Sequence, residues 1–339
     1  MLRISALCLS LLWPVETFAQ DAEWSGQINT IMEHQVLMRF DDLEDNTMKL
    51  SKAAAQSCDP EGETLRESLR MSLGAWASTS AFRFGPTEID NHSFALGFWP
   101  DPRGKTPKAL RKLILENDPI IDSAESFSRA SIAARGFYAM EYMLYEPAFQ
   151  EIGTGKYRCA LIRRQADDIA RTAQAIRDGW DDYKSHLLTP TIDTPYRTEA
   201  EVKRELFKGI STAVEFTSDT RLGRPLGTFD KPRPKRAEAR RSDMSLRLVE
   251  NSLASPWELS ITLASEDQKL SNALIIKFSK IKHAIEELGD PALSGVSDPA
   301  NRFRIESLKQ QIDELHAFLT ERLGPHLGVS AGFNSLDGD

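Results

Sequence analysis

Apolar residues recur at every third or fourth position along most of the chain from Glu23 onward, the period of α-helices with one buried face. Strict alternation of apolar and polar residues is scarce, and no Asn-Gly pair joins two apolar runs as in a β-hairpin. The pattern therefore predicts an all-α fold. The first two predicted apolar faces are Ile28, Met32, Val36, Phe40 and Leu43, and then Leu65, Leu69, Leu73 and Trp76.

Eight segments of about twelve to thirty residues carry this helical period, which is typical of helices packed in bundles. A mature length of roughly 320 residues suits one large or two medium domains, and we expect two. Beyond the two faces above, the predicted helices cover about residues 125–145, 157–187, 199–217, 249–263, 270–288 and 303–323.

The first interruption of the helical pattern runs from Gly85 to Pro107 and mixes prolines and glycines with Phe94, Phe98 and Trp99. A loop longer than about fifteen residues inside a compact domain is usually functional or packed down. Its aromatic content also argues against a flexible linker. Residues 289–300 form an ordinary turn region by comparison.

A second interruption, Gly223 to Arg241, concentrates positive charge and proline in an acidic protein. Two interpretations stay open: a solvated connector, or a docking patch for an acidic partner. The cations are Arg224, Lys231, Arg233, Lys235, Arg236, Arg240 and Arg241, and the prolines are Pro225, Pro232 and Pro234.

The first residues have the three parts of a cleavable signal peptide. Arg3 supplies the positive start, Ile4 to Trp13 supply an apolar run, and Thr17-Phe18-Ala19 supplies a small-x-small cleavage site. We expect residues 1–19 to be removed and the protein to reach the periplasm or cell envelope. Cys8 lies inside the apolar run rather than at its end, so a lipoprotein anchor is not expected. No later uncharged segment approaches the roughly twenty residues of a membrane span.

The formal charge of −8 and the isoelectric point of about 5.4 describe an acidic surface. Such a surface argues against nucleic acid or anionic lipid as a partner, because both repel it. Solubility alone is a simpler explanation for the charge.

Two cysteines, Cys58 and Cys159, remain once the leader is removed. In an oxidising compartment they allow one disulfide, which is the pairing we expect. It would close a loop of roughly 100 residues, which the chain-entropy description values at about 4–5 kcal/mol before strain. The alternative is two separate buried thiols.

No common catalytic motif is present, and the most unusual polar residue is Glu141. Ala134, Phe137 and Leu144 fall on the same helical face, which places a carboxylate inside an apolar stripe. A buried carboxylate needs a cation, hydrogen-bond donors, a metal ion or a proton of its own. We expect Arg221 to be the cation, and a structural ion pair, a ligand or metal contact and partial exposure all stay open.

Four further residues are candidates for the same site. Tyr138 lies one helical turn before Glu141, although a core tyrosine is the simpler interpretation. His34 lies on the flank of the first helix, where it could satisfy a backbone group or face a cleft, and a lone histidine is more often structural. Asp90 and His92, in the aromatic loop, are side chains of the kind that metals bind, although their spacing is not specific.

The sequence resembles the imelysin-like family, classed with the M75 peptidases, over almost the whole mature chain. The resemblance implies two related helical bundles packed together, residues 20–190 and 191–339, with a site in the cleft between them. It also implies an envelope location and a connection with iron uptake. The matching segments are residues 34–40, 82–86, 90–94, 98–100, 136–141, 221–227 and 332–339.

The signature of that family is Gly-x-His-x-x-Glu, and here it is matched by Gly136, Glu141 and, in place of the histidine, Tyr138. Neutral imidazole binds divalent transition metals, whereas a phenol binds well only when a hard ion such as Fe(III) displaces its proton. A zinc hydrolase also needs three protein ligands and a base. The substitution weakens the metallopeptidase hypothesis, and no catalytic residue is assigned.

Our leading hypothesis is an exported, non-enzymatic binding protein connected with the uptake of iron or another metal, with a metal ion or envelope iron-uptake components as partners. Glu141 and His34 are the predicted metal ligands, and the predicted site also contains Tyr138, Asp90, His92 and Arg221. One alternative is an M75-type metallopeptidase. Another is an interaction protein that docks a partner through residues 224–241, with a purely structural Glu141–Arg221 pair.

Overall fold

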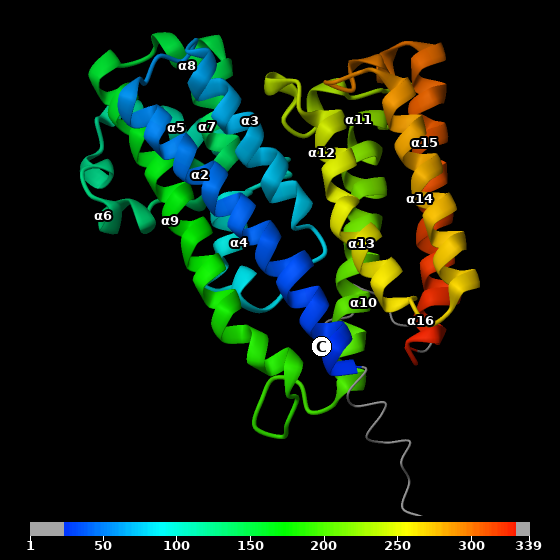
Figure 1. Cartoon of the computed structure of the whole chain (residues 1–339). Helices are drawn as coiled ribbons and strands as arrows, with labels where there is room; N and C mark the ends of the chain where they lie inside the picture. The colour runs from blue at the N-terminus through cyan, green and yellow to red at the C-terminus, as the bar shows by residue number, and fades with distance from the viewer. Residues whose placement is uncertain (1–23, 330–339) are drawn as a thin grey trace, which may run out of the picture.

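The computed structural model describes residues 24–329, so the predicted leader over 1–19 and the family-like segment over 332–339 lie outside the described residues. Within residues 24–329 the chain is helical and has no β-strand, only an isolated bridge between Thr228 and Lys231. This confirms the all-α prediction (Figure 1).

The helices of the first half pack mainly on one another, with α2 and α9 lying along each other and α3 and α7 beside them. A helix over residues 24–31 continues through the π-helical turn η1 (Met32–Leu37) into α2. The α-helices are α2 (Met38–Gln56), α3 (Glu63–Ser78), α4 (His92–Leu96), α5 (Lys105–Glu116), α6 (Ala124–Ser128), α7 (Gly136–Tyr145), α8 (Pro147–Glu151) and α9 (Gly155–Leu188). Short 3₁₀ turns are η2 (Gly85–Thr87), η3 (Ile89–Asn91), η4 (Pro119–Ile121) and η5 (Ile132–Ala134).

The helices of the second half form a second group, in which α10 packs on α13 and α15, and α14 packs on α15. In Figure 1 this group lies on the opposite side of the molecule from α2 and α9. Its α-helices are α10 (Glu199–Glu215), α11 (Gly223–Leu226), α12 (Ser245–Ser252), α13 (Ala254–Leu263), α14 (Gln268–Leu288), α15 (Pro299–Phe318) and α16 (Gly324–His326). Its other turns are η6 (Phe216–Leu222), η7 (Pro234–Arg236), η8 (Arg240–Ser242), η9 (Ser294–Ser297) and η10 (Leu319–Leu323).

The predicted apolar faces are buried. Ile28, Met32, Val36 and Phe40 are all in the core, and so is the face of α3 that ends at Trp76. Each fully buried side chain of this size contributes about 1.5–3 kcal/mol relative to an exposed one. The two faces therefore hold α2, α3 and α9 together.

The predicted helix over residues 125–145 is wrong in one respect, because the structure divides it into α6, η5 and α7. The division falls at Gly136, whose φ of +73° is in the left-handed region. A Cβ at this position would lie 2.3 Å from the carbonyl oxygens of Ala95 and Leu96. Only glycine permits this close approach, which brings the end of α4 against the start of α7.

Two other segments also differ from the pattern. The predicted helix over 249–263 is divided at Leu253 into α12 and α13, and α5 lies outside the eight predicted segments. Helix α5 buries Leu110, Leu113 and Ile114 against the first half of the molecule. The aromatic loop before it is packed, as expected, with Ala95 and Leu96 buried.

The predicted disulfide between Cys58 and Cys159 is confirmed. It joins the loop after α2 to the first turn of α9 across 101 positions of sequence, with Cα atoms 5.2 Å apart. The bond reinforces the packing of α2 along α9.

The two halves are also linked to each other by packing and polar contacts. Helix α3 packs on α12, the Gln35 amide donates to the Thr262 hydroxyl at 2.6 Å, and Arg39 pairs with Glu258 at 2.8 Å. The proposed domain boundary near residue 190 stays a prediction. No helix in the described part of the chain is long and apolar enough to cross a membrane.

Candidate functional site

A cavity of about 220 Å³, hereafter the central cavity, lies between the two halves of the chain. Residues from α3, the aromatic loop and α7 form one side of it, and residues from α10, η6 and the segment before η8 form the other. It is lined by Trp76, Ser80, Arg83, Glu88, Ser93, Phe94, Gly97, Trp99, Tyr138, Thr212, Ala213, Phe216, Arg221 and Glu238.

Three polar side chains in this cavity bind one another. The Tyr138 hydroxyl donates a hydrogen bond to Oε1 of Glu238, and Nε of Arg221 lies 2.7 Å from Oε2 of the same carboxylate. The Arg221 N–H is not aligned for a hydrogen bond, so this contact is an ion pair. All three side chains are buried, and the arrangement connects α7 of the first half to two segments of the second half.

The phenol of Tyr138 stays protonated in this environment. Burial raises its pKa well above the ordinary value of 10, and the neighbouring Glu238 charge raises it further. At neutral pH Tyr138 is therefore a hydrogen-bond donor.

Arg83 is the cation in the cavity that has no acidic partner. Its guanidinium lies 3.5 Å from the centre of the Trp76 ring and makes no hydrogen bond or ion pair with any residue in the range 24–329. Burial, and next the charge of Arg221, lower its pKa to about 10, so it is still charged at neutral pH. The buried hydroxyl oxygen of Thr212 in the same cavity also lacks a hydrogen-bond partner among the described residues.

The prediction that Glu141 is a buried carboxylate with partners is confirmed, but the predicted partner is wrong. Its Oε1 accepts hydrogen bonds from the backbone N–H groups of Arg241 and Ser242, both at 3.1 Å, and from the Ser242 hydroxyl at 2.9 Å. Nη1 of Arg241 lies 3.7 Å from Oε2. Arg221 instead binds Glu238. The donors to Glu141 come from the turn η8, which lies over α7.

A second cavity, of about 250 Å³, contains Glu141 and is hereafter the basic cavity. It shares Trp99 and Tyr138 with the central cavity, so these two side chains separate the two spaces. The basic cavity is lined by Phe98, Trp99, Asp101, Pro102, Thr106, Tyr138, Glu141, Tyr142, Arg224, Lys235, Arg236, Ala237, Ala239 and Arg241. Residues 224–241, for which the sequence left a connector and a docking patch open, thus line both cavities.

The other predicted site residues lie outside both cavities. His34 is exposed on η1, and Asp90 is exposed in η3 with a φ of +50°. The imidazole of His92 lies 3.3 Å from the carbonyl oxygen of Pro86, at Nδ1. The structure therefore brings Tyr138 to Glu141 in one cavity and to Arg221 in the other, but not to the two histidines.

The residues around Glu141 do not fit a metal ion. Within residues 24–329 no group of three or more His, Cys, Asp or Glu side chains is arranged to hold one. Glu141 uses one carboxylate oxygen for three donors, and Tyr138 retains its proton. The predicted pair of ligands, Glu141 and His34, is not in one cavity. The assignment of Glu141 and His34 as metal ligands therefore stays a prediction without support from the described residues.

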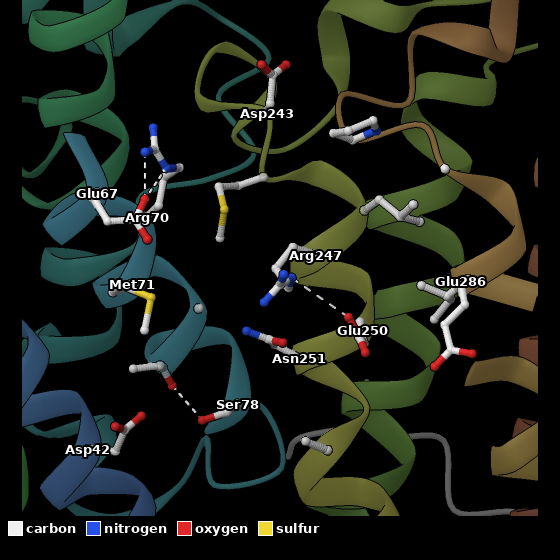
Figure 2. Close-up of a pocket in the computed structure, with 18 residues that line it drawn as sticks. Asp42, Glu67, Arg70, Met71, Ser78, Asp243, Arg247, Glu250, Asn251 and Glu286 are labelled. Atoms are coloured by element: carbon white, nitrogen blue, oxygen red, sulfur yellow. Dashed lines mark hydrogen bonds and ion pairs between the residues drawn. The ribbon is translucent and has the colours of Figure 1, made fainter. Parts of the chain in front are cut away.

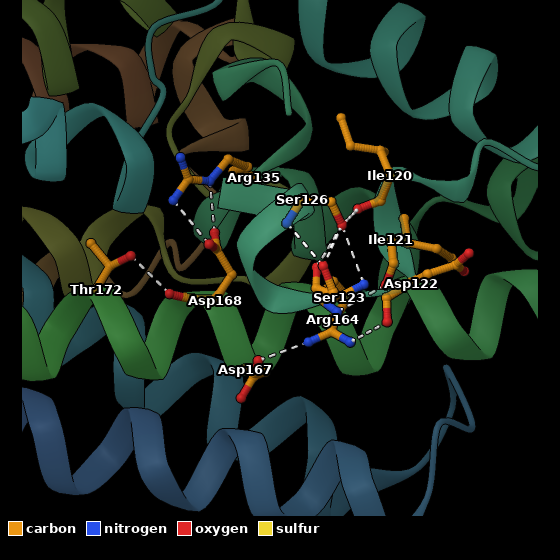
Figure 3. Close-up of polar contacts among 10 residues, drawn as sticks. All are labelled: Ile120, Ile121, Asp122, Ser123, Ser126, Arg135, Arg164, Asp167, Asp168 and Thr172. Carbon is orange, nitrogen blue, oxygen red and sulfur yellow. Dashed lines mark hydrogen bonds and ion pairs between the residues drawn. The ribbon is translucent and has the colours of Figure 1, made fainter. Parts of the chain in front are cut away.

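The start of α7, which carries both Tyr138 and Glu141, is held on α9 by a buried ion pair. Arg135, directly before Gly136, donates two hydrogen bonds to Asp168 of α9, at 2.8 and 2.9 Å (Figure 3). It also donates to the carbonyl oxygen of Ser128. Such a bidentate pair fixes orientation as well as distance.

A larger groove, of about 620 Å³, lies between α3 and α12 (Figure 2). Its cations are already paired: Nε of Arg70 donates to Glu67 at 2.8 Å, and Arg247 lies 3.9 Å from Glu250. The groove therefore lacks a free cation of the kind found in the central cavity.

The sequence matches the family model of imelysin, in the M75 peptidase class, over residues 36–319. Because the match covers most of the chain, the protein belongs to the imelysin family. Gly136, Tyr138 and Glu141 lie within the matched residues. No curated protein matches the sequence.

Two solved structures share the fold. An imelysin-like protein from Psychrobacter arcticum has a TM-score of 0.78 and 17% sequence identity, over 97% of this chain and 100% of that one. A protein described as an iron-regulated protein A precursor, from Parabacteroides distasonis, has a TM-score of 0.64 and 14% identity, over 91% of this chain and 95% of that one. At these identities the likeness concerns the fold alone.

Arg83, Thr212 and Glu238 were not among the predicted site residues. Arg83 lies between two phenylalanines in a segment that carries the family resemblance, which was a usable signal. Glu238 is a carboxylate in a strongly basic segment, where an acidic side chain is conspicuous. Nothing in the helical pattern distinguishes Thr212.

We predict that Glu141→Ala lowers the free energy of unfolding by about 2–4 kcal/mol, because it leaves the buried donors of Arg241 and Ser242 without an acceptor. Glu141→Gln keeps an acceptor oxygen, so its loss should be smaller. Denaturant unfolding of the three proteins at neutral pH measures both changes. Equal losses for the two variants would contradict the role of Glu141 as an acceptor.

The difference in stability between the wild type and Glu141→Gln should depend on pH. Burial raises the pKa of Glu141 above the ordinary 4.5 more strongly than Arg241 and Ser242 lower it, so the folded state binds this proton more readily than the unfolded state. As the pH falls from neutral through the raised pKa, the wild type should gain stability relative to Glu141→Gln. The gain should level off below about 4.5.

Proposed function

We propose that this imelysin family member is an exported, non-enzymatic binding protein of the cell envelope, and that the central cavity binds a small organic anion. The observation that carries the proposal is the Arg83 guanidinium, which lies on Trp76 inside the cavity without an acidic partner in the described chain. A guanidinium in a cavity that has no acidic partner can donate charge-assisted hydrogen bonds to a bound anion.

The chemistry of the cavity walls defines the ligand further. Trp76, Phe94, Trp99 and Phe216 supply flat apolar surfaces, which suit a planar apolar body. Arg83 and the Thr212 hydroxyl supply donors for a carboxylate. Pockets for drug-sized ligands measure about 300–1,000 Å³. The central cavity, at about 220 Å³, thus suits a smaller molecule of this kind.

The proposal of binding rather than turnover rests on the contacts that the cavity carboxylates already make. The two buried carboxylates of the cavities are engaged, since Glu238 binds Arg221 and Tyr138, and Glu141 binds Ser242 and Arg241. The exposed Glu88 of the central cavity accepts from the Ser93 hydroxyl. The donor set of the described residues does not fit the metal ion that an M75-type peptidase would need. We therefore do not carry the metallopeptidase alternative forward.

We predict that benzoate binds the mature protein with at least about tenfold higher affinity than benzamide, which has the same shape but no charge. One charge-assisted hydrogen bond accounts for a difference of this size. Trp76 and Trp99 line the cavity, so tryptophan fluorescence follows the titration. Arg83→Gln should remove the preference for benzoate.

Arg103→Gln is the matched control, because it removes an exposed arginine of the same segment between α3 and α5 that lines neither cavity. It should bind benzoate like the wild type. Equal affinities for benzoate and benzamide in the wild type, or unchanged binding by Arg83→Gln, would overturn the proposed ligand class.

Export and the connection with iron form a separate part of the proposal. They rest on the leader-like first nineteen residues and on the iron-regulated description of one structural relative. We predict that the protein recovered from a periplasmic extract begins at Gln20, and that its amount rises on iron starvation. N-terminal sequencing and quantitative immunoblotting measure the two outcomes. Absence of the protein from the periplasmic extract would refute export, an intact N-terminus would refute cleavage after Ala19, and an iron-independent amount would refute the iron connection.

A further inference from the structure

The basic cavity differs from the central cavity in its charge. Four cations line it, namely Arg224, Lys235, Arg236 and Arg241, on a protein whose formal charge is −8. Concentration of one sign of charge in a concave space raises the local potential and attracts the opposite sign. The question is whether the acidic side chains of the same cavity already balance these cations.

Both acidic side chains of the cavity are engaged elsewhere. Asp101 uses one carboxylate oxygen for the backbone N–H of Lys105, at 2.9 Å, and the other for that of Thr106, at 2.8 Å, at the start of α5. Glu141 accepts three hydrogen bonds from the η8 turn. Neither forms an ion pair with Arg224, Lys235 or Arg236 in the described chain.

Of the four cations, Arg241 alone has acidic partners among the described residues, Glu146 at 2.8 Å and Glu141 at 3.7 Å. Nε of Arg224 is buried and has no hydrogen-bond partner in that range. Burial, and next the charge of Arg236, lower the pKa of Arg224. The cations thus repel one another, and a bound anion would relieve this repulsion.

The backbone holds two of these cations in place. Lys235 and Arg236 belong to the turn η7, which is closed by hydrogen bonds from the N–H of Arg236 to the carbonyl of Arg233, at 2.8 Å, and from Ala237 to Pro234, at 3.1 Å. Proline at 234 also restricts the backbone. Less conformational entropy is then lost when a ligand binds.

We propose that the basic cavity is a second binding site, which takes a phosphate group through Arg224, Lys235 and Arg236. Phosphate carries up to two negative charges and several acceptor oxygens, and thus matches three unpaired cations better than a single carboxylate does. The site is distinct from the one in the proposed function, since Trp99 and Tyr138 separate it from Arg83.

The test is a calorimetric titration of the mature protein with inorganic phosphate at constant ionic strength. We expect saturable one-to-one binding. Lys235→Gln combined with Arg236→Gln should weaken it at least about tenfold, the effect of losing one or more charge-assisted hydrogen bonds. No saturation by about 10 mM would overturn the proposal.

A matched control comes from the same segment. Lys231→Gln combined with Arg233→Gln removes the same charge from exposed side chains that do not line the cavity. This control should change phosphate affinity less than about twofold, because distant exposed charges are screened by salt. An equal loss in both double variants would show a general charge effect and overturn the site.

Two further arms identify the source of the phosphate and separate this proposal from the proposed function. Glycerol 3-phosphate represents a small soluble phosphomonoester, and phosphatidylcholine vesicles with phosphatidic acid represent a lipid headgroup. We expect the soluble ester to compete with phosphate, and we expect the vesicles not to retain the protein. If the vesicles do bind the protein, and the double variant Lys235→Gln with Arg236→Gln does not bind them, the phosphate group belongs to a lipid. Arg83→Gln should leave phosphate binding unchanged, and tighter binding of citrate than of phosphate would overturn the phosphate assignment.

Discussion

The buried ion pair between Arg221 and Glu238, completed by the Tyr138 hydroxyl, is the interaction on which both cavities depend. It joins α7 of the first half to η6 and the segment before η8 of the second half. Breaking a buried pair by removing one partner costs about 3–5 kcal/mol, because the other charge is then left uncompensated. The three side chains therefore fix how the halves meet, and with it the position of Trp99 between the two cavities.

The pairing also determines what chemistry the site has left. Glu238 is paired with Arg221 and Tyr138 and forms no ion pair with Arg83, whose guanidinium lies on Trp76 without an ion-pair partner among residues 24–329. Because Tyr138 is a buried donor with a raised pKa, it keeps its proton at neutral pH and is not available as a phenolate ligand. On either side of Tyr138, Gly136 permits the close approach of α4 and Glu141 binds the η8 turn.

The sequence predicted the apolar face that starts at Ile28 and the burial of Glu141 because both depend on the spacing of near neighbours in the chain. The disulfide spans 101 positions and was predictable for another reason, since only two cysteines remain once the predicted leader is removed. The ion-pair partners of the buried charged side chains were not predictable from the sequence. Whether Arg221 meets Glu141 or Glu238 depends on how η8 lies over α7, which is a tertiary contact between residues about 100 positions apart. The break at Gly136 depends likewise on the close approach of α4.

The central claim is that Tyr138 and Glu238 act as a coupled pair across the two halves, and a double-mutant cycle of Tyr138→Phe and Glu238→Gln measures it most directly. Tyr157→Phe combined with Glu238→Gln is the control, since the Tyr157 hydroxyl donates instead to the backbone of Asp118. We predict a coupling of at least about 1 kcal/mol in the free energy of unfolding for the first pair, and additivity for the control. Additivity of the first pair within about 0.5 kcal/mol would contradict the account.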